Sequence, residues 1–372
     1  MNLPLYYSMY LIKPKKNLWV FGAWFGEKYL DNPRFLFEYI KANHEDIKTI
    51  WITKDKHTCG RSNFVYKYSL RGVYYALVAD VFIVTHATNC DLYDFINHNS
   101  RKVIQLWHGI PIKKIGKDDK RHVEKLFKER VKYLLFPFLR AKYSLIIASS
   151  IEDQKNMSTA FNVIIDNVKV TGYPRNDIFV SESKLPNQFK VLYAPTLRDE
   201  VGSEVNLFDG YGFDIAKVLR ILEANEIFLD IKMHLANKID IKFKNSINSK
   251  YINFLESKME INEIIKDYSI IISDYSGIYV DYLLTNRPII FAPFDYEKYI
   301  IKDRELYYDY DEVTPGPQCK NWDDVLDWTI KFKENSALYK NEREEVRDRF
   351  HRFHDNKNSE RVIEAILELG RG

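Results

Sequence analysis

The sequence has few of the features that mark membrane-spanning, disulfide-rich or nucleic-acid-binding proteins. Nowhere in its 372 residues do about 18 apolar residues follow one another, so no segment is expected to cross a bilayer. Its three cysteines (Cys59, Cys90 and Cys319) are widely separated, which fits free thiols in a reducing compartment. Lys and Arg number 55 against 52 Asp and Glu, a net charge of +3, so the overall charge does not indicate nucleic acid as a partner.

Signals for secretion, cofactors and metals are also missing. Pro4, Lys13 and Pro14 interrupt the aromatic N-terminus, which lacks the basic-then-apolar layout of a secretion signal. Neither GxGxxG nor GxxxxGK[ST] occurs, so neither a dinucleotide nor a P-loop site is indicated. No residues have a metal-ligand spacing, and we predict no metal and no cofactor. We expect a cytoplasmic protein.

What the chain does contain is a regular alternation of short apolar runs with helical patterns. This alternation predicts an α/β protein with parallel, doubly wound sheets. The polar stretch 181–188 (SESKLPNQ) indicates a boundary between two Rossmann-like domains, 1–182 and 189–356. A last helix within 357–372 is expected to pack back on the first domain. The predicted strands are 18–21, 49–53, 80–85, 103–106, 144–148, 168–170, 190–194, 227–233, 251–255, 269–273 and 288–292.

One loop, in the segment VIQLWHGIPIKKIG (103–116), carries the clearest chemical signal. The apolar run 103–106 leads into His108, and Gly109 and Pro111 then stop the strand. His108 should therefore lie at the carboxyl edge of a parallel sheet, where ligands bind in such folds. An imidazole there suits removing a proton from an acceptor, while the lysines that follow hold phosphate. A structural histidine that only orders the loop is an equally good interpretation of this segment alone.

Other strand ends carry polar residues suited to phosphate. Arg175 follows a Gly-Tyr-Pro turn, and guanidinium groups bind phosphate with two hydrogen bonds, although a plain surface arginine is the commoner case. Thr196 follows Ala194 and Pro195, and Lys232, Met233 and His234 end another strand. Ser276 and Gly277 open a helix whose first amides could bind an anion, or Ser276 could be only an N-cap.

The segment 117–142 is basic and amphipathic. It holds nine Lys or Arg against four Asp or Glu, and its apolar residues recur at helical spacing. Such a helix can lie in a lipid interface. The alternative, equally supported, is that the apolar stripe packs on its own sheet while the charges are solvated.

Taken together, the segments resemble the CDP-glycerol glycerophosphotransferase family, whose members prime and polymerise wall teichoic acid and related capsule polymers. The similar segments, in matching order and spacing, are FGAWFGEKYLDNPRFLFEY, LWHGIPIKKIG, TGYPRND, APTLRD, SDYSGIYVDYLLTNRPIIFAPFD, DRELYYDYDEVTPGP and NKNSERVIEAI.

The resemblance implies a GT-B-like fold, with two parallel sheets facing across a cleft and the nucleotide held mainly by the C-terminal domain. It implies transfer of glycerol phosphate from CDP-glycerol to a hydroxyl of a lipid-linked or polymeric acceptor, with release of CMP, at the inner face of the cell membrane. His108 would be the general base, and His234 the second catalytic residue. The implied donor-binding residues are Gly109, Ile110, Pro111, Ile112, Arg175, Pro195, Thr196, Lys232, Met233, Ser276, Gly277 and Asp281.

Two departures from the family pattern leave the donor open. Lys232-Met233-His234-Leu235 stands where the family has Arg-x-His-Pro, and Gly277 replaces a second serine. CDP-ribitol or another CDP-polyol therefore remains an alternative donor. Two other functions also stay open: a GT-B glycosyltransferase that uses a nucleotide sugar, and a catalytically silent lipid-surface or assembly protein.

Overall fold

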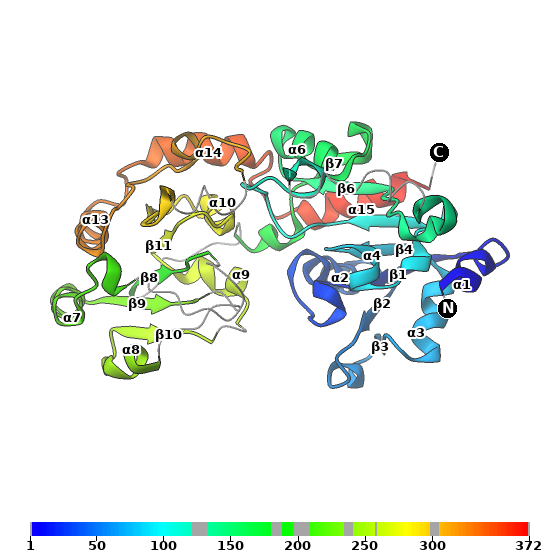
Figure 1. Cartoon of the computed structure of the whole chain (residues 1–372), viewed down its shortest axis with the longest axis horizontal. Helices are drawn as coiled ribbons and strands as arrows, with labels where there is room; N and C mark the ends of the chain where they lie inside the picture. The colour runs from blue at the N-terminus through cyan, green and yellow to red at the C-terminus, as the bar shows by residue number, and fades with distance from the viewer. Residues whose placement is uncertain are drawn as a thin grey trace. The chain divides into compact units, whose positions relative to one another are not determined.

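The computed structural model describes residues 2–120, 132–179, 188–196, 208–233, 241–256, 259–297 and 305–370. The chain divides into two compact units, which Figure 1 shows coloured along the chain. Unit 1 comprises Met1–Ile110, Ile115–Asp177 and His351–Gly372, and unit 2 comprises Pro111–Lys114 and Ile178–Phe350. The chain thus leaves unit 1 close to the expected boundary and returns to it before the last helix.

Unit 1 is built on a seven-stranded parallel sheet with the order β3-β2-β1-β4-β5-β6-β7. Its central strands are apolar along nearly their whole length and are buried, because helices cover both faces of a parallel sheet. Val20 of β1 lies opposite Phe82 of β4, which in turn lies opposite Val103 of β5. The strands are β1 (Lys15–Phe21), β2 (Lys48–Thr53), β3 (Phe64–Tyr66), β4 (Ala79–Val84), β5 (Lys102–Gln105), β6 (Leu145–Ala148) and β7 (Val168–Val170).

The helices of unit 1 begin and end at recognisable capping residues. The Ser69 side chain accepts a hydrogen bond from Gly72 N at the start of α3, and Ser150 does the same for Asp153 N at the start of α6. Asn162 ends α6 in the left-handed conformation. The helices are α1 (Asn2–Ser8), α2 (Asp31–Asn43), α3 (Leu70–Val78), α4 (Thr88–Asp91), α6 (Ile151–Phe161) and α15 (Asn358–Glu368).

The last helix, α15, packs within unit 1 against α2. The carboxylate of Asp177 caps it from a distant part of the chain, accepting hydrogen bonds from Asn358 N at 2.8 Å, Ser359 N at 3.0 Å and Ser359 Oγ at 2.6 Å. Arg361 donates to the carbonyl of Thr171 at 3.0 Å. These contacts fix the returning chain beside the point where it left unit 1.

Unit 2 repeats the architecture with a five-stranded parallel sheet in the order β10-β9-β8-β11-β12. Its core combines the inner faces of these strands with an aromatic cluster in which Trp322 stacks on Phe208 at 5.9 Å. The strands are β8 (Phe189–Tyr193), β9 (Ile227–Ile231), β10 (Ile252–Phe254), β11 (Ile270–Ser273) and β12 (Ile289–Phe291). The helices are α7 (Ile215–Ala224), α8 (Ile241–Ser246), α9 (Ile261–Ile264), α10 (Ile278–Tyr282), α12 (Tyr310–Val313), α13 (Trp322–Glu334) and α14 (Lys340–Phe350).

The predicted α/β class with parallel sheets is confirmed, and each of the eleven predicted strands coincides with an observed one to within a few residues. The strand β3, whose three residues are too short for a clear pattern, was not predicted, and neither were several helices, among them α6, α13 and α14. In the described part of the chain, no helix combines the length and apolarity that crossing a membrane would need. Within the predicted amphipathic segment 117–142, residues 121–131 lie outside the described residues, while 117–120 and 132–142 are described.

Candidate active site

The strand orders locate the candidate site in each unit. In both sheets the order reverses beside the first strand, between β1 and β4 in unit 1 and between β8 and β11 in unit 2. Loops that leave the carboxyl ends of two such strands diverge, and the crevice between them is where doubly wound folds bind ligands. The loops after β1, β4 and β5 carry His108 and its neighbours, and those after β8 and β11 carry Thr196 and Ser276.

Two buried residues at the start of α2 hold the loops of unit 1 together. The Asp31 carboxylate accepts hydrogen bonds from Trp24 Nε1 at 3.1 Å and from Arg175 Nη1 at 2.9 Å. The Asn32 side chain donates to the carbonyls of Leu106 and Trp107 and accepts from Arg175 N, all at 3.1 Å. The loops after β1, β5 and β7 are therefore tied to one helix end.

Arg175 is part of this network and is only 6% exposed. Besides its ion pair with Asp31, its Nη1 donates to the carbonyl of His108 at 2.8 Å. Gly109 lies against the guanidinium with φ of +119°, and a Cβ built there would be 2.3 Å from Arg175 Nη2. In this structure Arg175 orders the His108 loop; its expected contact with phosphate stays a prediction.

His108 stacks on a second histidine, His86, which follows β4. The two imidazole rings are nearly parallel, at 14°, with their centres 4.8 Å apart. Trp107 packs at 4.1 Å and Trp24 at 5.9 Å from the His108 ring, and Phe25 contacts His86 at 4.5 Å. His86 was not among the predicted site residues, although it directly follows a predicted strand, and that position was a usable signal.

A buried carboxylate, Asp91, orders the loop that carries His86. Asp91 accepts hydrogen bonds from the backbone N–H groups of Phe25, Thr85 and His86 at 2.7–2.8 Å, and its Oδ1 lies 3.7 Å from His86 Nδ1. The Thr85 hydroxyl bonds the same ring nitrogen at 2.9 Å. The Thr85 hydroxyl also donates to Asp91 Oδ2 at 3.1 Å, so it accepts a hydrogen bond from a protonated His86 Nδ1, and Nε2 is then the ring nitrogen that can accept a proton.

Burial lowers the pKa of both histidines. The pKa of His108 falls from 6.5 to about 3, chiefly because of burial and then because of the neighbouring His86 and Arg175, with Asp31 opposing. Burial likewise lowers the pKa of His86, opposed by the charges of Asp91 and Asp31. Both rings are neutral at pH 7, which is the state that accepts a proton. His108 Nδ1 is buried with no hydrogen-bond partner among the described residues.

The backbone around these side chains is strained. Trp24, Phe25, Asp31 and Trp107 have φ of +46°, +61°, +65° and +49°, although none is glycine. Such left-handed residues cost on the order of 1–3 kcal/mol each and concentrate at functional sites. Their occurrence in the loops around His86 and His108 marks this edge of unit 1 as the candidate catalytic centre.

In unit 2, the corresponding loops are joined by Asp274. Its carboxylate accepts hydrogen bonds from Thr196 N at 3.0 Å, Thr196 Oγ1 at 2.6 Å and Tyr275 N at 2.7 Å, and Tyr310 donates to its carbonyl at 3.0 Å. Asp274 is 1% exposed and was quoted in the sequence motif without a role. The expected donor contacts of Pro195, which is buried, and of Thr196 stay predictions.

The other predicted donor-binding residues of unit 2 differ in how deeply they are buried. Lys232 and Ser276 are half-buried, Met233 is buried, and Asp281 is fully buried with Asn262 Nδ2 at 3.4 Å from its carboxylate. The helix that Gly277 caps, α10, has five residues, so its dipole at Ser276 and Gly277 is short. His234 lies outside the described residues. These roles stay predictions.

The segment after His108 passes from one unit to the other. Gly109 and Ile110 belong to unit 1, whereas Pro111 and Ile112 are buried in unit 2, where the Ile112 carbonyl accepts from Tyr307 N at 2.9 Å. Lys114 Nζ pairs with Glu305 at 2.7 Å. Lys114 is thus engaged in an ion pair, while the predicted donor contacts of residues 109–112 stay predictions.

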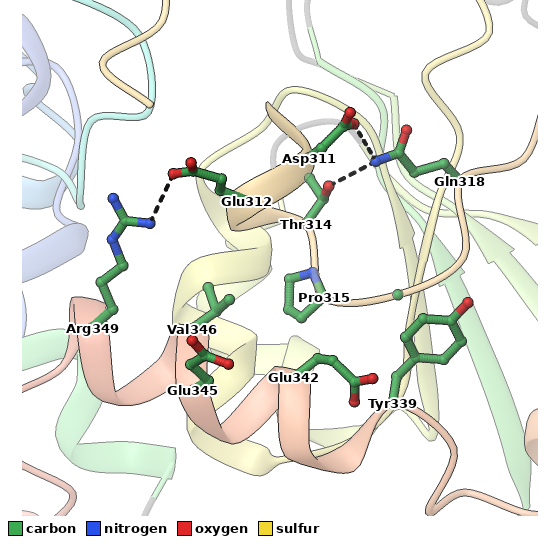
Figure 2. A pocket seen from close by; sticks show the side chains of 11 residues that line it. Asp311, Glu312, Thr314, Pro315, Gln318, Tyr339, Glu342, Glu345, Val346 and Arg349 are labelled. Atoms are coloured by element: carbon green, nitrogen blue, oxygen red, sulfur yellow. Dashed lines mark hydrogen bonds and ion pairs between the residues drawn. The ribbon is translucent and has the colours of Figure 1, made fainter. Parts of the chain in front are cut away.

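A cavity of about 570 Å³ lies beside α12 and α14 in unit 2 (Figure 2). Four carboxylates line it (Asp311, Glu312, Glu342 and Glu345), and its Arg349 is paired with Glu312 at 3.5 Å. This negative lining would repel a diphosphate ester, so we do not place a CDP-linked donor there. Among the described residues, no three His, Cys, Asp or Glu side chains are grouped as metal ligands.

Comparison with known proteins identifies the family. The profile of the CDP-Glycerol:Poly(glycerophosphate) glycerophosphotransferase family matches residues 5–368. The chain belongs to this family. The resemblance inferred from the motifs is therefore confirmed, as is the conclusion that the protein is a transferase of the glycerophosphotransferase type.

Related members of the glycerophosphotransferase family cover nearly the whole chain. A teichoic acid glycerol-phosphate transferase of Staphylococcus aureus is 26% identical over 95% of this chain and 94% of its own length. A teichoic acid poly(glycerol phosphate) polymerase of Bacillus spizizenii is 27% identical over 96% and 93%. A solved structure of the wall teichoic acid polymerase TagF superposes with a TM-score of 0.77, at 22% identity, over 95% of this chain and 89% of that one. The GT-B-like α/β fold is thereby confirmed.

Proposed function

We propose that this glycerophosphotransferase moves glycerol phosphate from CDP-glycerol to an acceptor hydroxyl and releases CMP during the synthesis of a teichoic acid or capsule polymer. Family membership supports the reaction, and the relatives' names support the polymer. One further solved structure of TagF was obtained after a soak with CDPG. The observation that carries the proposal is the pair of neutral, stacked imidazoles at the sheet edge of unit 1.

His108 and His86 divide the proton chemistry in this proposal. The acceptor oxygen attacks the β-phosphorus of the donor, the P–O bond to CMP breaks, and the acceptor proton passes to an imidazole nitrogen. A base with a pKa of about 3 is weak, but the negative charge of a bound diphosphate would raise the pKa of His108 toward neutrality. His86 is the second candidate base, since Thr85, which donates to Asp91, bonds its Nδ1 and leaves its Nε2 to accept a proton.

The residues proposed to bind the donor are those that the family resemblance implies. Phosphoryl transfer depends mostly on positioning and charge stabilisation, so cationic side chains and backbone amides matter more than a covalent nucleophile. Lys232, His234 and the amides at Ser276 and Gly277 would hold the diphosphate, and Thr196, fixed by Asp274, would line the nucleotide pocket. Arg175 acts here by positioning the His108 carbonyl and loop.

The experiment measures CMP release by purified protein with CDP-glycerol and, separately, CDP-ribitol. We expect His108→Ala to lower turnover by roughly 10²–10⁴-fold, the usual contribution of a general base. His57→Ala, which removes an exposed histidine of the same unit, is the matched control and should be unaffected. A folded His108→Ala variant with normal turnover would remove His108 from the mechanism, and the His86→Ala variant then tests the second base.

The acceptor and the membrane are the finer parts of the proposal. A lipid-linked or polymeric acceptor would bring the enzyme to the inner face of the membrane, and the basic segment 117–142 is its expected contact there. Reversing the charges of this segment should reduce co-sedimentation with liposomes. Binding that does not change would end this part of the proposal without touching the transfer reaction.

A further inference from the structure

A second basic surface lies at the opposite, amino-terminal edge of the unit 1 sheet. A cavity of about 240 Å³ there is lined by Lys15, Lys16, Lys48, Tyr74 and Tyr75, together with Asn17, Leu18 and Asp46. Lysine and tyrosine thus dominate it, and three ammonium groups face one carboxylate. The mechanism proposed above uses none of these residues, because the candidate catalytic loops leave the carboxyl ends of the same strands.

The tyrosines hold the cations at the rim of this cavity. Lys15 Nζ donates a hydrogen bond to the Tyr74 hydroxyl at 2.7 Å and lies 5.2 Å from the centre of that ring. Lys48 Nζ and the Arg71 guanidinium each lie 5.7 Å from the Tyr75 ring. A hydrogen bond from Arg71, with the charge of Lys48, lowers the pKa of Tyr75. The Asp46 carboxylate accepts from Asn17 at 3.2 Å. The cavity therefore has a positive lining.

Exposed apolar side chains stand a few residues before the first lysine of this cavity. Leu11 is 90% exposed and Tyr10 62% exposed, only a few residues before Lys15. Four residues of chain span at most about 14 Å, so Leu11 lies near the lysines. Arg101 fixes this stretch by donating both to the Ile12 carbonyl at 2.9 Å and to the Leu77 carbonyl, at the end of the helix that carries the tyrosines, at 2.8 Å.

A second exposed apolar segment meets α1 from elsewhere in unit 1. Leu134 is 83% exposed and Leu135 61% exposed, directly before the 3₁₀ turn η6 (Pro137–Leu139), which contacts α1. Tyr6 of α1 packs against Phe138 of that turn, with ring centres 6.0 Å apart. Figure 1 places α1 and α3 at the same end of unit 1. The exposed leucines therefore precede a turn that contacts α1, and α1 leads along the chain to Tyr10 and Leu11.

We infer that this end of unit 1 is a docking surface for an anionic lipid membrane, with the Lys15–Lys16–Lys48 cavity taking the phosphate of a lipid headgroup while Tyr10, Leu11 and Leu134 enter the interface. Lysines attract anionic leaflets, aromatic side chains settle at the headgroup level, and apolar side chains add burial. A polyol-phosphate chain could pair with the lysines, but it has no apolar surface for the exposed leucines to contact. A lipid surface provides both interactions. The inference rests on the proposed function only in that such a surface would bring the enzyme to a lipid-linked acceptor.

The test is flotation of the full chain with vesicles of phosphatidylcholine alone or mixed with phosphatidylglycerol. Each lysine near an anionic surface strengthens binding roughly five-fold, so Lys15→Ala/Lys16→Ala/Lys48→Ala should lower the partition coefficient on mixed vesicles about a hundred-fold. The control Lys41→Ala/Lys155→Ala/Lys169→Ala removes three exposed lysines of the same unit and should bind like the unchanged protein. Tyr10→Ser/Leu11→Ser should weaken binding to both kinds of vesicle.

Several outcomes separate the inference from its alternatives. Mixed-vesicle binding that is equal for the cavity variant and the control variant overturns it. So does a cavity variant that loses binding to inorganic phosphate or to soluble poly(glycerol phosphate) but keeps binding to vesicles, because the cavity would then serve a free phosphate ligand. CMP release with a soluble acceptor should be unchanged in every variant, so a failure of the docking surface is distinguishable from a failure of the transferase reaction.

Discussion

Replacing Gly109 by alanine is the sharpest test of how the His108 loop is built. The added Cβ would be 2.3 Å from Arg175 Nη2 and 3.2 Å from Arg175 Cζ. The end of an arginine can usually move away, but this one is 6% exposed and its Nη1 is held by Asp31 at 2.9 Å and by the His108 carbonyl at 2.8 Å. The alanine therefore displaces a buried ion pair or distorts the loop.

The cost of Gly109→Ala has two parts. Breaking a buried ion pair costs about 3–5 kcal/mol, and a side chain at φ of +119° adds roughly 1–3 kcal/mol. The sum, about 4–8 kcal/mol, is comparable with the whole stability of a typical domain, about 5–15 kcal/mol. We expect the unit 1 transition in urea to shift to much lower denaturant, and any folded fraction to release CMP more slowly.

The control variants of Gly109→Ala are compared by the same urea unfolding measurement. Gly60→Ala changes a glycine of the same unit with no atom within 4 Å of the added Cβ and no positive φ, so it should shift stability by less than about 0.5 kcal/mol. Adding Arg175→Lys to Gly109→Ala should restore part of the loss, because the slimmer ammonium can keep Asp31 without meeting the Cβ. If Gly109→Ala unfolds at the same denaturant concentration as Gly60→Ala, Arg175 does not clamp this loop.

Two further predictions concern the ends of the network. Asp177→Ala removes three hydrogen bonds to the start of α15 and should lower the free energy of unfolding by about 1–2 kcal/mol, measured by urea titration; an unchanged midpoint would contradict the capping role. The pKa of His108, lowered to about 3, means that the unfolded chain binds a proton below pH 6.5 while the folded one does not. Stability should therefore fall between pH 6.5 and 3, by about 2 kcal/mol at pH 5, and His108→Asn should flatten this part of the profile in thermal unfolding; parallel profiles for both proteins would refute it.

The local pattern of the chain was enough to predict much of the fold. Apolar runs such as Val103–Leu106 are buried on both faces in a parallel sheet, so their composition alone identified them as strands. The short strand β3 was not predicted because three residues show no periodicity. Helix α6 was not predicted because its apolar face is weak. The last helix was predicted, but its cap, Asp177, lies far away in the sequence, where no local rule could find it.

The candidate site divides in the same way. That His108 ends a strand beside glycine and proline, and that the chain carries the motifs of one family, could be predicted from sequence, because turn chemistry and motif order are local properties. The stacking of His86 on His108 and the ion pair of Asp31 with Arg175 became visible only in the folded chain. The physical reason is that a parallel sheet brings the ends of β1, β4, β5 and β7 to one edge, so that loops separated by up to about 140 residues share hydrogen bonds and a buried environment that shifts their pKa values.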